Sequence, residues 1–343
     1  MGYSKRPPFV RGSIIAPEMS MVKKGRSVGH PPATRREMPS LANRILRGPN
    51  AIRAGWRCLI FLSIVTALIL ATSGIVRLLR HEHASTSAPI LTPMAAFVWD
   101  GPVLFYMVLA ALIMARIERR RFSQYGLTLR SAFGRDFWIG TAIGFATVST
   151  ILAGISAFHG FRLTGLAIHG SAIATSLAAW GAAFALGGLT EEFAFRGYLQ
   201  YTLTTGIGFW PAALVLSALF ALSHAGNPGE SKAGLLMIVA FGLLLCLFLR
   251  RTGNLWLAIG FHSGYDWTTT FFYGVSDSGY VPYHNLLNSH FGGPNWLTGG
   301  TAGPEASVFA PIVLAIVAIV FSRVYTENRY CIEPQFSKDE GRS

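Results

Sequence analysis

Eight stretches of about 20 mostly apolar residues recur along the chain, and each is long enough to cross the hydrocarbon core of a membrane as an α-helix. Helices are required in such a place because an open strand edge in lipid would leave backbone N–H and C=O groups unpaired. The sequence therefore predicts an all-α, polytopic membrane protein with about eight transmembrane helices. The predicted spans cover residues 58–76, 90–115, 137–158, 171–203, 208–224, 233–249, 255–275 and 307–323.

The composition agrees with this class. Hydrophobic residues make up 51% of the chain and charged residues 13%, whereas a water-facing surface needs roughly 25–35% charged residues. A soluble enzyme is therefore excluded. The cysteines Cys58, Cys246 and Cys331 are few, scattered and without a CxxC pair, which excludes a disulfide scaffold and a zinc ribbon.

The net charge of +13 is concentrated next to the apolar stretches rather than spread over the chain. Residues 1–57 hold twelve Lys and Arg against Glu18 and Glu37, and shorter basic clusters at 116–121 and 250–251 border predicted spans. This is the positive-inside pattern of membrane proteins, so nucleic acid is not expected as a partner and membrane lipid is. With an even number of spans, both termini are predicted to be cytoplasmic, in the plasma membrane of a bacterium.

The chain divides into regions of different character. Proline and basic residues dominate the first region, which is predicted to be disordered. Asp100, which precedes Gly101 and Pro102, is expected to cap a helix, and the glycine-rich residues 276–306 are expected to form an outer loop. The predicted regions are a tail (1–50), N-terminal transmembrane helices (51–134), a core that holds the polar motifs described next (135–275), and the outer loop, last span and cytoplasmic tail (276–343).

Three predicted spans carry ionisable residues, although a charge near the bilayer centre costs roughly 2.5–3.5 kcal/mol on insertion scales. Such residues need a partner or a function. The fourth span carries Glu191, Glu192 and Arg196, the fifth carries Phe220 and His224, and the seventh carries His262 and Asp266.

Helical geometry separates the two adjacent glutamates. Glu192 and Arg196 are four residues apart and can pair on one face, whereas Glu191 is turned by about 100° and has no such partner in its own helix. His224 and His262 are the natural groups for Glu191 to meet. A carboxylate in an apolar pocket suits a general base, and nearby imidazoles can orient water or donate to a developing oxyanion.

Two neighbours of the histidines have supporting roles in this hypothesis. Asp266, four residues after His262, is expected to fix the tautomer of that ring, and Phe220, one turn before His224, is expected to form a wall of the pocket. Simple alternation of the spans predicts different membrane depths for the three groups. A tilted fourth helix would bring Glu191 to the depth of the imidazoles.

The order of these motifs resembles the CPBP family of intramembrane proteases, which includes the type II CAAX prenyl endopeptidases (Rce1-like) and the bacterial Abi self-immunity proteins. The family pattern is EExxxR, then FxxxH, then HxxxN. The resemblance covers about residues 135–275, where the chain reads Glu191-Glu192 with Arg196, Phe220 with His224, and His262 with Asp266.

The resemblance implies an endopeptidase in which Glu191 activates the attacking water with help from His224. It further implies that His262 and the residue four positions later stabilise the oxyanion, while Glu192 and Arg196 hold the site together. The implied substrate is a peptide or protein at the membrane, either prenylated or membrane-embedded.

The metal dependence of such a site is open at this point. A metal-free glutamate mechanism, which needs no cofactor, is the favoured interpretation. The alternative is a catalytic zinc site with Glu191, His224 and His262 as its three ligands and an open fourth position. The chain has no HExxH sequence, in which two ligands and the base share one helix.

Asp266 departs from the family pattern, which has asparagine at this position. An ionised aspartate cannot donate to an oxyanion, so Asp266 is protonated, orients His262 or marks an altered site. The altered site motivates a second hypothesis, a catalytically silent membrane protein of the same fold that acts in self-immunity or scaffolding. Transport through a polar cavity is a third hypothesis, which rests on the buried charges alone.

Overall fold

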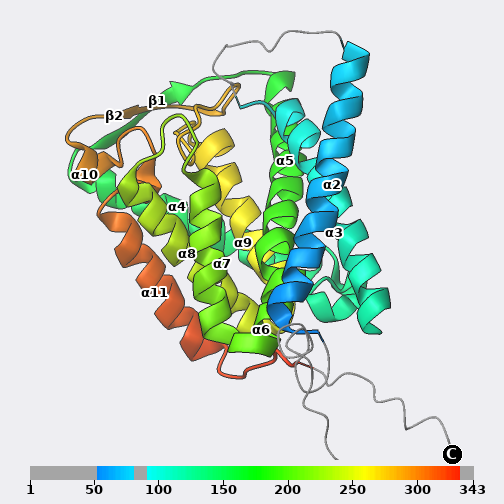
Figure 1. Cartoon of the computed structure of the whole chain (residues 1–343). Coiled ribbons are helices and arrows are strands. Elements are labelled where there is room, and N and C mark those ends of the chain that lie inside the picture. The colour runs from blue at the N-terminus through cyan, green and yellow to red at the C-terminus, as the bar shows by residue number, and fades with distance from the viewer. Residues whose placement is uncertain (1–51, 81–90, 333–343) are drawn as a thin grey trace, which may run out of the picture.

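The computed structural model describes residues 52–80 and 91–332, which form a helical bundle with a small sheet at one end (Figure 1). The predicted tail of residues 1–50 lies outside the described residues. The helices are α2 (Ala54–Arg80), α3 (Pro93–Glu118), α4 (Arg135–Ala157), α5 (Ser171–Arg196), α6 (Tyr198–Ile207), α7 (Phe209–His224), α8 (Lys232–Thr252), α9 (Trp256–Asp266), α10 (Asn295–Thr298) and α11 (Phe309–Val324). Shorter elements are the 3-10 helices η1 (Phe122–Tyr125), η2 (Leu129–Ser131) and η4 (Pro304–Ala306), the π-helix η3 (Trp267–Phe272), and the strands β1 (Phe161–Leu166) and β2 (Leu287–Phe291).

Within the described residues, five helical segments are long and apolar enough to cross a membrane, and they indicate an integral multi-pass membrane protein. They are α2, α3, α4, α8 and the stretch Ser171–Ile207, which contains α5 and α6. The helices α7 and α11 are apolar but shorter. The predicted span 255–275 corresponds to α9 and the π-helical continuation η3. Each of the eight predicted stretches is thus largely helical, but not all eight have the length of a full crossing.

The start of α3 differs from the prediction. The helix begins at Pro93, and the hydroxyl of Thr92 accepts a hydrogen bond from the N–H of Ala95 at 3.1 Å. Thr92 followed by Pro93 is a cap followed by a first-turn proline, the same signal that was read at Asp100. The prediction that Asp100 caps a helix is therefore wrong, because Asp100 lies inside α3.

The outer loop also contains structure that the all-α prediction lacks. Strands β1 and β2 pair antiparallel, with Phe161 opposite Phe291 and Leu166 opposite Leu287. The sheet lies at the end of the bundle away from α6 (Figure 1). It joins the connection between α4 and α5 to the predicted loop 276–306, which also contains α10 and η4.

Glycines allow α9 to lie at the centre of the bundle against α4. Gly140 and Gly144 of α4 face Gly260 and Gly264 of α9, and a Cβ at any of the four would overlap backbone atoms of the other helix. Small residues spaced four apart let membrane helices approach this closely. Residues 256–265 of α9 are all buried as a result.

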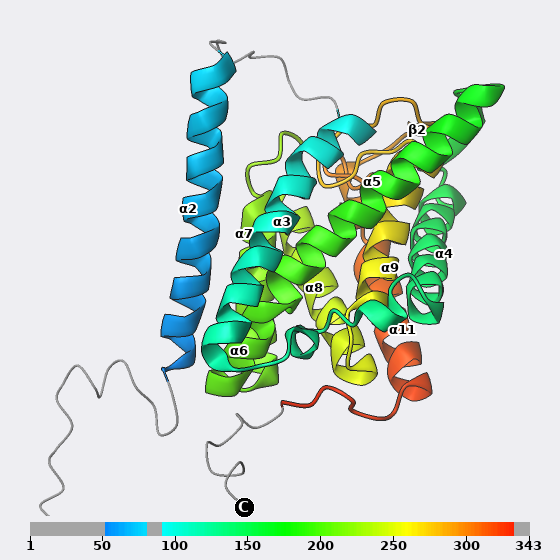
Figure 2. The same ribbon diagram turned by 90° about the vertical axis from the view of Figure 1, so that its right-hand side faces the viewer.

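The helices on the other side of α9 are α5, α3 and α2. Figure 2 shows α5 crossing the bundle obliquely, with α3 beside it and α2 standing at the outside. A buried polar cluster fastens α2. Arg57 of α2 lies 2.8 Å from the carboxylate of Glu118 in α3 and also donates to Thr205 of α6, and Tyr198 of α6 donates to the same carboxylate. We call these four residues the α2 clamp.

Candidate active site

Three helices bring one carboxylate and two imidazoles together. Glu191 Oε2, from α5, lies 3.6 Å from His262 Nε2 of α9 and 4.0 Å from His224 Nε2 at the end of α7. These distances are slightly longer than hydrogen bonds. Because Glu191 lies within 4.0 Å of both imidazoles, the depth difference that simple alternation predicted does not occur. Figure 2 shows the oblique path of α5, the helix that carries Glu191.

Both imidazoles have their Nδ1 atoms fixed. His224 Nδ1 lies 2.8 Å from the carbonyl oxygen of Phe220, and His262 Nδ1 lies 2.9 Å from Glu192 Oε1. Since a carbonyl only accepts, His224 carries its proton on Nδ1. The fixed nitrogens orient the rings so that both Nε2 atoms face Glu191.

The pair formed by Glu192 and Arg196 contacts His262 through Glu192. Arg196 Nη1 is 3.2 Å from Glu192 Oε1, and both side chains are fully buried. Gly242 of α8 leaves room for the guanidinium, because a Cβ there would lie 2.5 Å from Arg196 Nη2. Glu192 therefore links Arg196 to His262, and sequence spacing alone predicted only the first of these two contacts.

Asp266 contacts His262 at Nε2, whereas Glu192 contacts the same ring at Nδ1. Asp266 Oδ2 lies 3.4 Å from Nε2, the nitrogen that also faces Glu191. Glu192 Oε1 lies 2.9 Å from Nδ1, so a carboxylate stands at each ring nitrogen of His262, and the role of Asp266 in fixing the tautomer stays a prediction. Asp266 stands beside the atom that would meet a substrate, at the last residue of α9.

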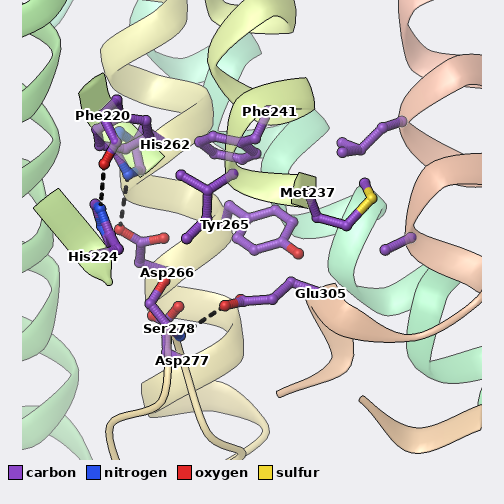
Figure 3. A pocket seen from close by; sticks show the side chains of 13 residues that line it. Phe220, His224, Met237, Phe241, His262, Tyr265, Asp266, Asp277, Ser278 and Glu305 are labelled. Carbon is purple, nitrogen blue, oxygen red and sulfur yellow. Dashed lines mark hydrogen bonds and ion pairs between the residues drawn. The ribbon is translucent and has the colours of Figure 1, made fainter. Parts of the chain in front are cut away.

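Phe220 forms a wall of the site, as its position in the sequence predicted. Its ring centroid lies 4.7 Å from that of His224 and 5.9 Å from that of His262, both in edge-on contacts. The guanidinium carbon of Arg196 lies 4.5 Å from the centroid of the same ring. Figure 3 shows Phe220, His224, His262 and Asp266 gathered at one end of a pocket.

A cavity of about 350 Å³ opens in front of Glu191 and the histidines. One of the residues that line it, Asp100 of α3, was not among the predicted site residues. An ionisable side chain inside an apolar span is itself a signal of function, and that signal was available in the sequence. The acidic and histidine residues that line the cavity are Asp100, Glu191, His224, His262, Asp266 and Asp277.

A smaller pocket of about 40 Å³ lies on the far side of His262 and Asp266 (Figure 3). Its acidic wall comes from Asp277, in the loop after η3, and from Glu305 of η4, which accepts a hydrogen bond from the N–H of Ser278 at 2.8 Å. Burial raises the pKa of Asp277 to about 6, and burial also raises the pKa of Glu305. These acids belong to the predicted outer loop, where sequence reasoning assigned no site residue.

The three zinc ligands considered from the sequence converge, but on a single carboxylate oxygen. Glu191 Oε2 faces both Nε2 atoms, at the distances given above. Within residues 52–80 and 91–332, no group of three or more His, Cys, Asp and Glu side chains is arranged to hold a metal ion. The metal-free mechanism stays the prediction and zinc binding stays its alternative.

Comparison with known proteins supports the resemblance seen in the motifs. The family model described as "Type II CAAX prenyl endopeptidase Rce1-like" matches residues 173–268. These residues run from α5 to the start of η3 and contain all the predicted site residues. The chain therefore contains a domain of the Rce1-like type II CAAX prenyl endopeptidases, a group of proteases. No curated protein matches the chain.

Proposed function

We propose that the protein is an intramembrane endopeptidase that hydrolyses a peptide bond with water activated by Glu191. The observation that carries this proposal is the meeting of Glu191 Oε2 with two oriented Nε2 atoms at the wall of a 350 Å³ cavity. The Rce1-like domain at the same residues supports the same class of reaction. The substrate class that follows is a peptide or protein at the membrane, prenylated or membrane-embedded.

The proposed reaction begins at a water molecule held between Glu191 and His224. Glu191 takes a proton from the water, whose oxygen attacks the peptide carbonyl. A His262 ring that is protonated on both nitrogens donates Nδ1–H to Glu192 and Nε2–H to the oxyanion. Glu191 then passes its proton to the leaving amine as the C–N bond breaks.

Each supporting residue has a place in this scheme. Glu192 holds His262 through Nδ1, and Arg196 balances the charge of Glu192 inside the bundle. Asp266 positions the Nε2 side of His262, where the family pattern has asparagine. In the plasma membrane of a bacterium, with both termini in the cytoplasm, the basic clusters would lie on the cytoplasmic side.

The test is whether the purified full-length protein in liposomes cleaves a membrane-embedded peptide and a prenylated peptide. Mass spectrometry detects the products. Glu191→Gln should abolish cleavage at unchanged expression. Glu327→Gln is the matched control, because that carboxylate is 72% exposed and lies outside the site. Retained cleavage by Glu191→Gln would refute the role of Glu191.

The same assay addresses the metal. We expect cleavage to survive exhaustive chelation, with no stoichiometric zinc in the purified protein by elemental analysis. Loss of activity that only zinc restores would instead assign Glu191, His224 and His262 as zinc ligands.

A second candidate function follows from Asp266, which replaces the family's asparagine next to His262 Nε2. In that case the protein is a catalytically silent relative that acts by binding a partner in self-immunity or scaffolding. Neither peptide is then cleaved by the wild-type protein. A cellular phenotype of the deletion strain would then be complemented equally by the wild type and by Glu191→Gln.

A further inference from the structure

Asp100 places a carboxylate in the cavity from outside the Rce1-like domain. It lies in α3, whereas the matched region is 173–268. Its side chain is half-buried and lines the 350 Å³ cavity together with Glu191. Within the described residues, no hydrogen bond or ion pair to the Asp100 carboxylate is found. Its oxygens are therefore available to accept hydrogen bonds from a ligand.

The contacts between α3 and α5 fix the position of Asp100 relative to Glu191. Asp100 Oδ2 lies 3.4 Å from the position that a Cβ of Gly187 would take, and the hydroxyl of Thr190 lies 3.4 Å from the backbone oxygen of Asp100. Gly187 precedes Glu191 by four residues on the same face of α5. Asp100 is therefore offset from Glu191 by about one helical turn, roughly 6 Å along the axis.

The charge of the cavity lining is one-sided. Four carboxylates and two imidazoles line it, and no Lys or Arg is found among the described residues that do so. The buried guanidinium of Arg196 is turned towards Glu192. A substrate that enters with a free C-terminal carboxylate would meet no cation at the wall, whereas a cationic group would meet Asp100 where water is partly excluded and charge interactions are stronger.

We propose that the cavity selects peptides with a cationic group close to the scissile bond, and that Asp100 is the specificity-determining residue that binds this group. The proposal rests on the proposed endopeptidase function and names its substrate class. The cationic group is a Lys or Arg side chain or a free N-terminal amine. An extended peptide rises about 3.3 Å per residue, so an offset of roughly 6 Å places the cationic group within about two residues of the scissile bond.

The experiment uses the full-length protein in liposomes and the membrane-embedded and prenylated peptides of the cleavage assay, made with a Lys, Gln or Glu within two residues of the cleavage site and with a free or an acetylated N-terminus. We expect kcat/KM to be at least about tenfold higher for Lys than for Gln, which corresponds to about 1.4 kcal/mol. In Asp100→Asn this ratio should fall to near one, and Asp100→Lys should favour the Glu peptide. Glu327→Gln is the control and should keep the wild-type ratio. If the free amine is the recognised group, acetylation rather than the varied residue will change the rate.

A binding measurement separates this inference from the proposed function. Fluorescence anisotropy of the same peptides is measured with the Glu191→Gln protein, with and without Asp100→Asn. If the wild type cleaves no peptide but the cationic peptides bind in an Asp100-dependent way, the proposed function falls and the recognition by Asp100 stands. If the wild type cleaves, and Asp100→Asn changes neither the Lys-to-Gln ratio nor the effect of acetylation, the recognition is overturned and the peptidase stands. If there is neither cleavage nor Asp100-dependent binding, both proposals are overturned.

Discussion

The close contact between α4 and α9 predicts that Gly264→Ala destabilises the protein, although alanine is the better helix former. Gly264 lies in α9 between His262 and Asp266. A Cβ at this position would lie 2.5 Å from the carbonyl oxygen of Thr141 and 2.7 Å from its Cα. Non-bonded carbon contacts are optimal at about 3.5 Å or more, so the helices would have to separate by roughly 1 Å.

The magnitude follows from two opposing effects. Replacing Gly by Ala inside a helix favours the folded state by about 1 kcal/mol, while overpacking a close contact costs about 1–3 kcal/mol. The obstructing atoms belong to the backbone and cannot rotate away as a side chain can, so the cost should be in the upper part of that range. The net loss is about 1–2 kcal/mol, or a fall in Tm of roughly 2–8 °C.

Gly181→Ala is the matched control. Gly181 lies inside α5, and among the described residues a Cβ there would contact only Trp267 Nε1, at an ordinary 3.8 Å. This variant keeps the propensity gain without the clash, so its Tm should rise by about 2–4 °C. Thermal unfolding of the full-length variants in one detergent, followed by tryptophan fluorescence, measures both. A Gly264→Ala protein that melts at or above the wild-type temperature would refute the reasoning.

Two further predictions concern buried carboxylates. Glu192→Gln leaves Arg196 without its counter-charge, so it should destabilise the protein by about 3–5 kcal/mol. Adding Arg196→Met should recover most of this loss in the same unfolding assay. No recovery would show that the two residues are not coupled. Asp277, whose pKa is raised to about 6 in the folded protein, binds more protons there than in the unfolded chain between about pH 4 and 6. The contribution of Asp277 to stability therefore falls as the pH rises through that window. Asp277→Asn should flatten the dependence of Tm on pH. An unchanged dependence would contradict the raised pKa of Asp277.

The sequence was sufficient to find three motifs that all lie within the matched region 173–268, because ionisable groups inside apolar stretches stand out. The resemblance was expected over the longer range 135–275. The spacing of Glu192 and Arg196 predicted their contact, and the isolation of Glu191 in its own helix predicted that its neighbours come from other helices. Hydropathy could not show that these groups meet, because their depth depends on the tilt of α5, which is set by packing rather than by composition.

Other features were missed for separate physical reasons. The pairing of β1 with β2 joins segments more than a hundred residues apart, and such long-range pairing leaves no local periodic signal. Asp100 was misread because a cap followed by proline occurs twice, at Thr92 and at Asp100, and only the first begins the helix. The small residues Gly140, Gly144, Gly260 and Gly264 did carry a readable signal, since their four-residue spacing is typical of close helix pairs.

The α2 clamp and the buried side chains of Cys58, Phe61 and Val65 join α2 to the bundle through its first turns. Arg57 reaches Glu118 and Thr205 near the start of α2, so the side-chain ion pair that holds the helix lies close to one end. An engineered chain that exchanges the part of α2 beyond Val65 for an unrelated apolar span of the same length should still dock, provided that it keeps Arg57 and also Phe61, which is buried and stacks on Tyr198 with ring centroids 4.6 Å apart.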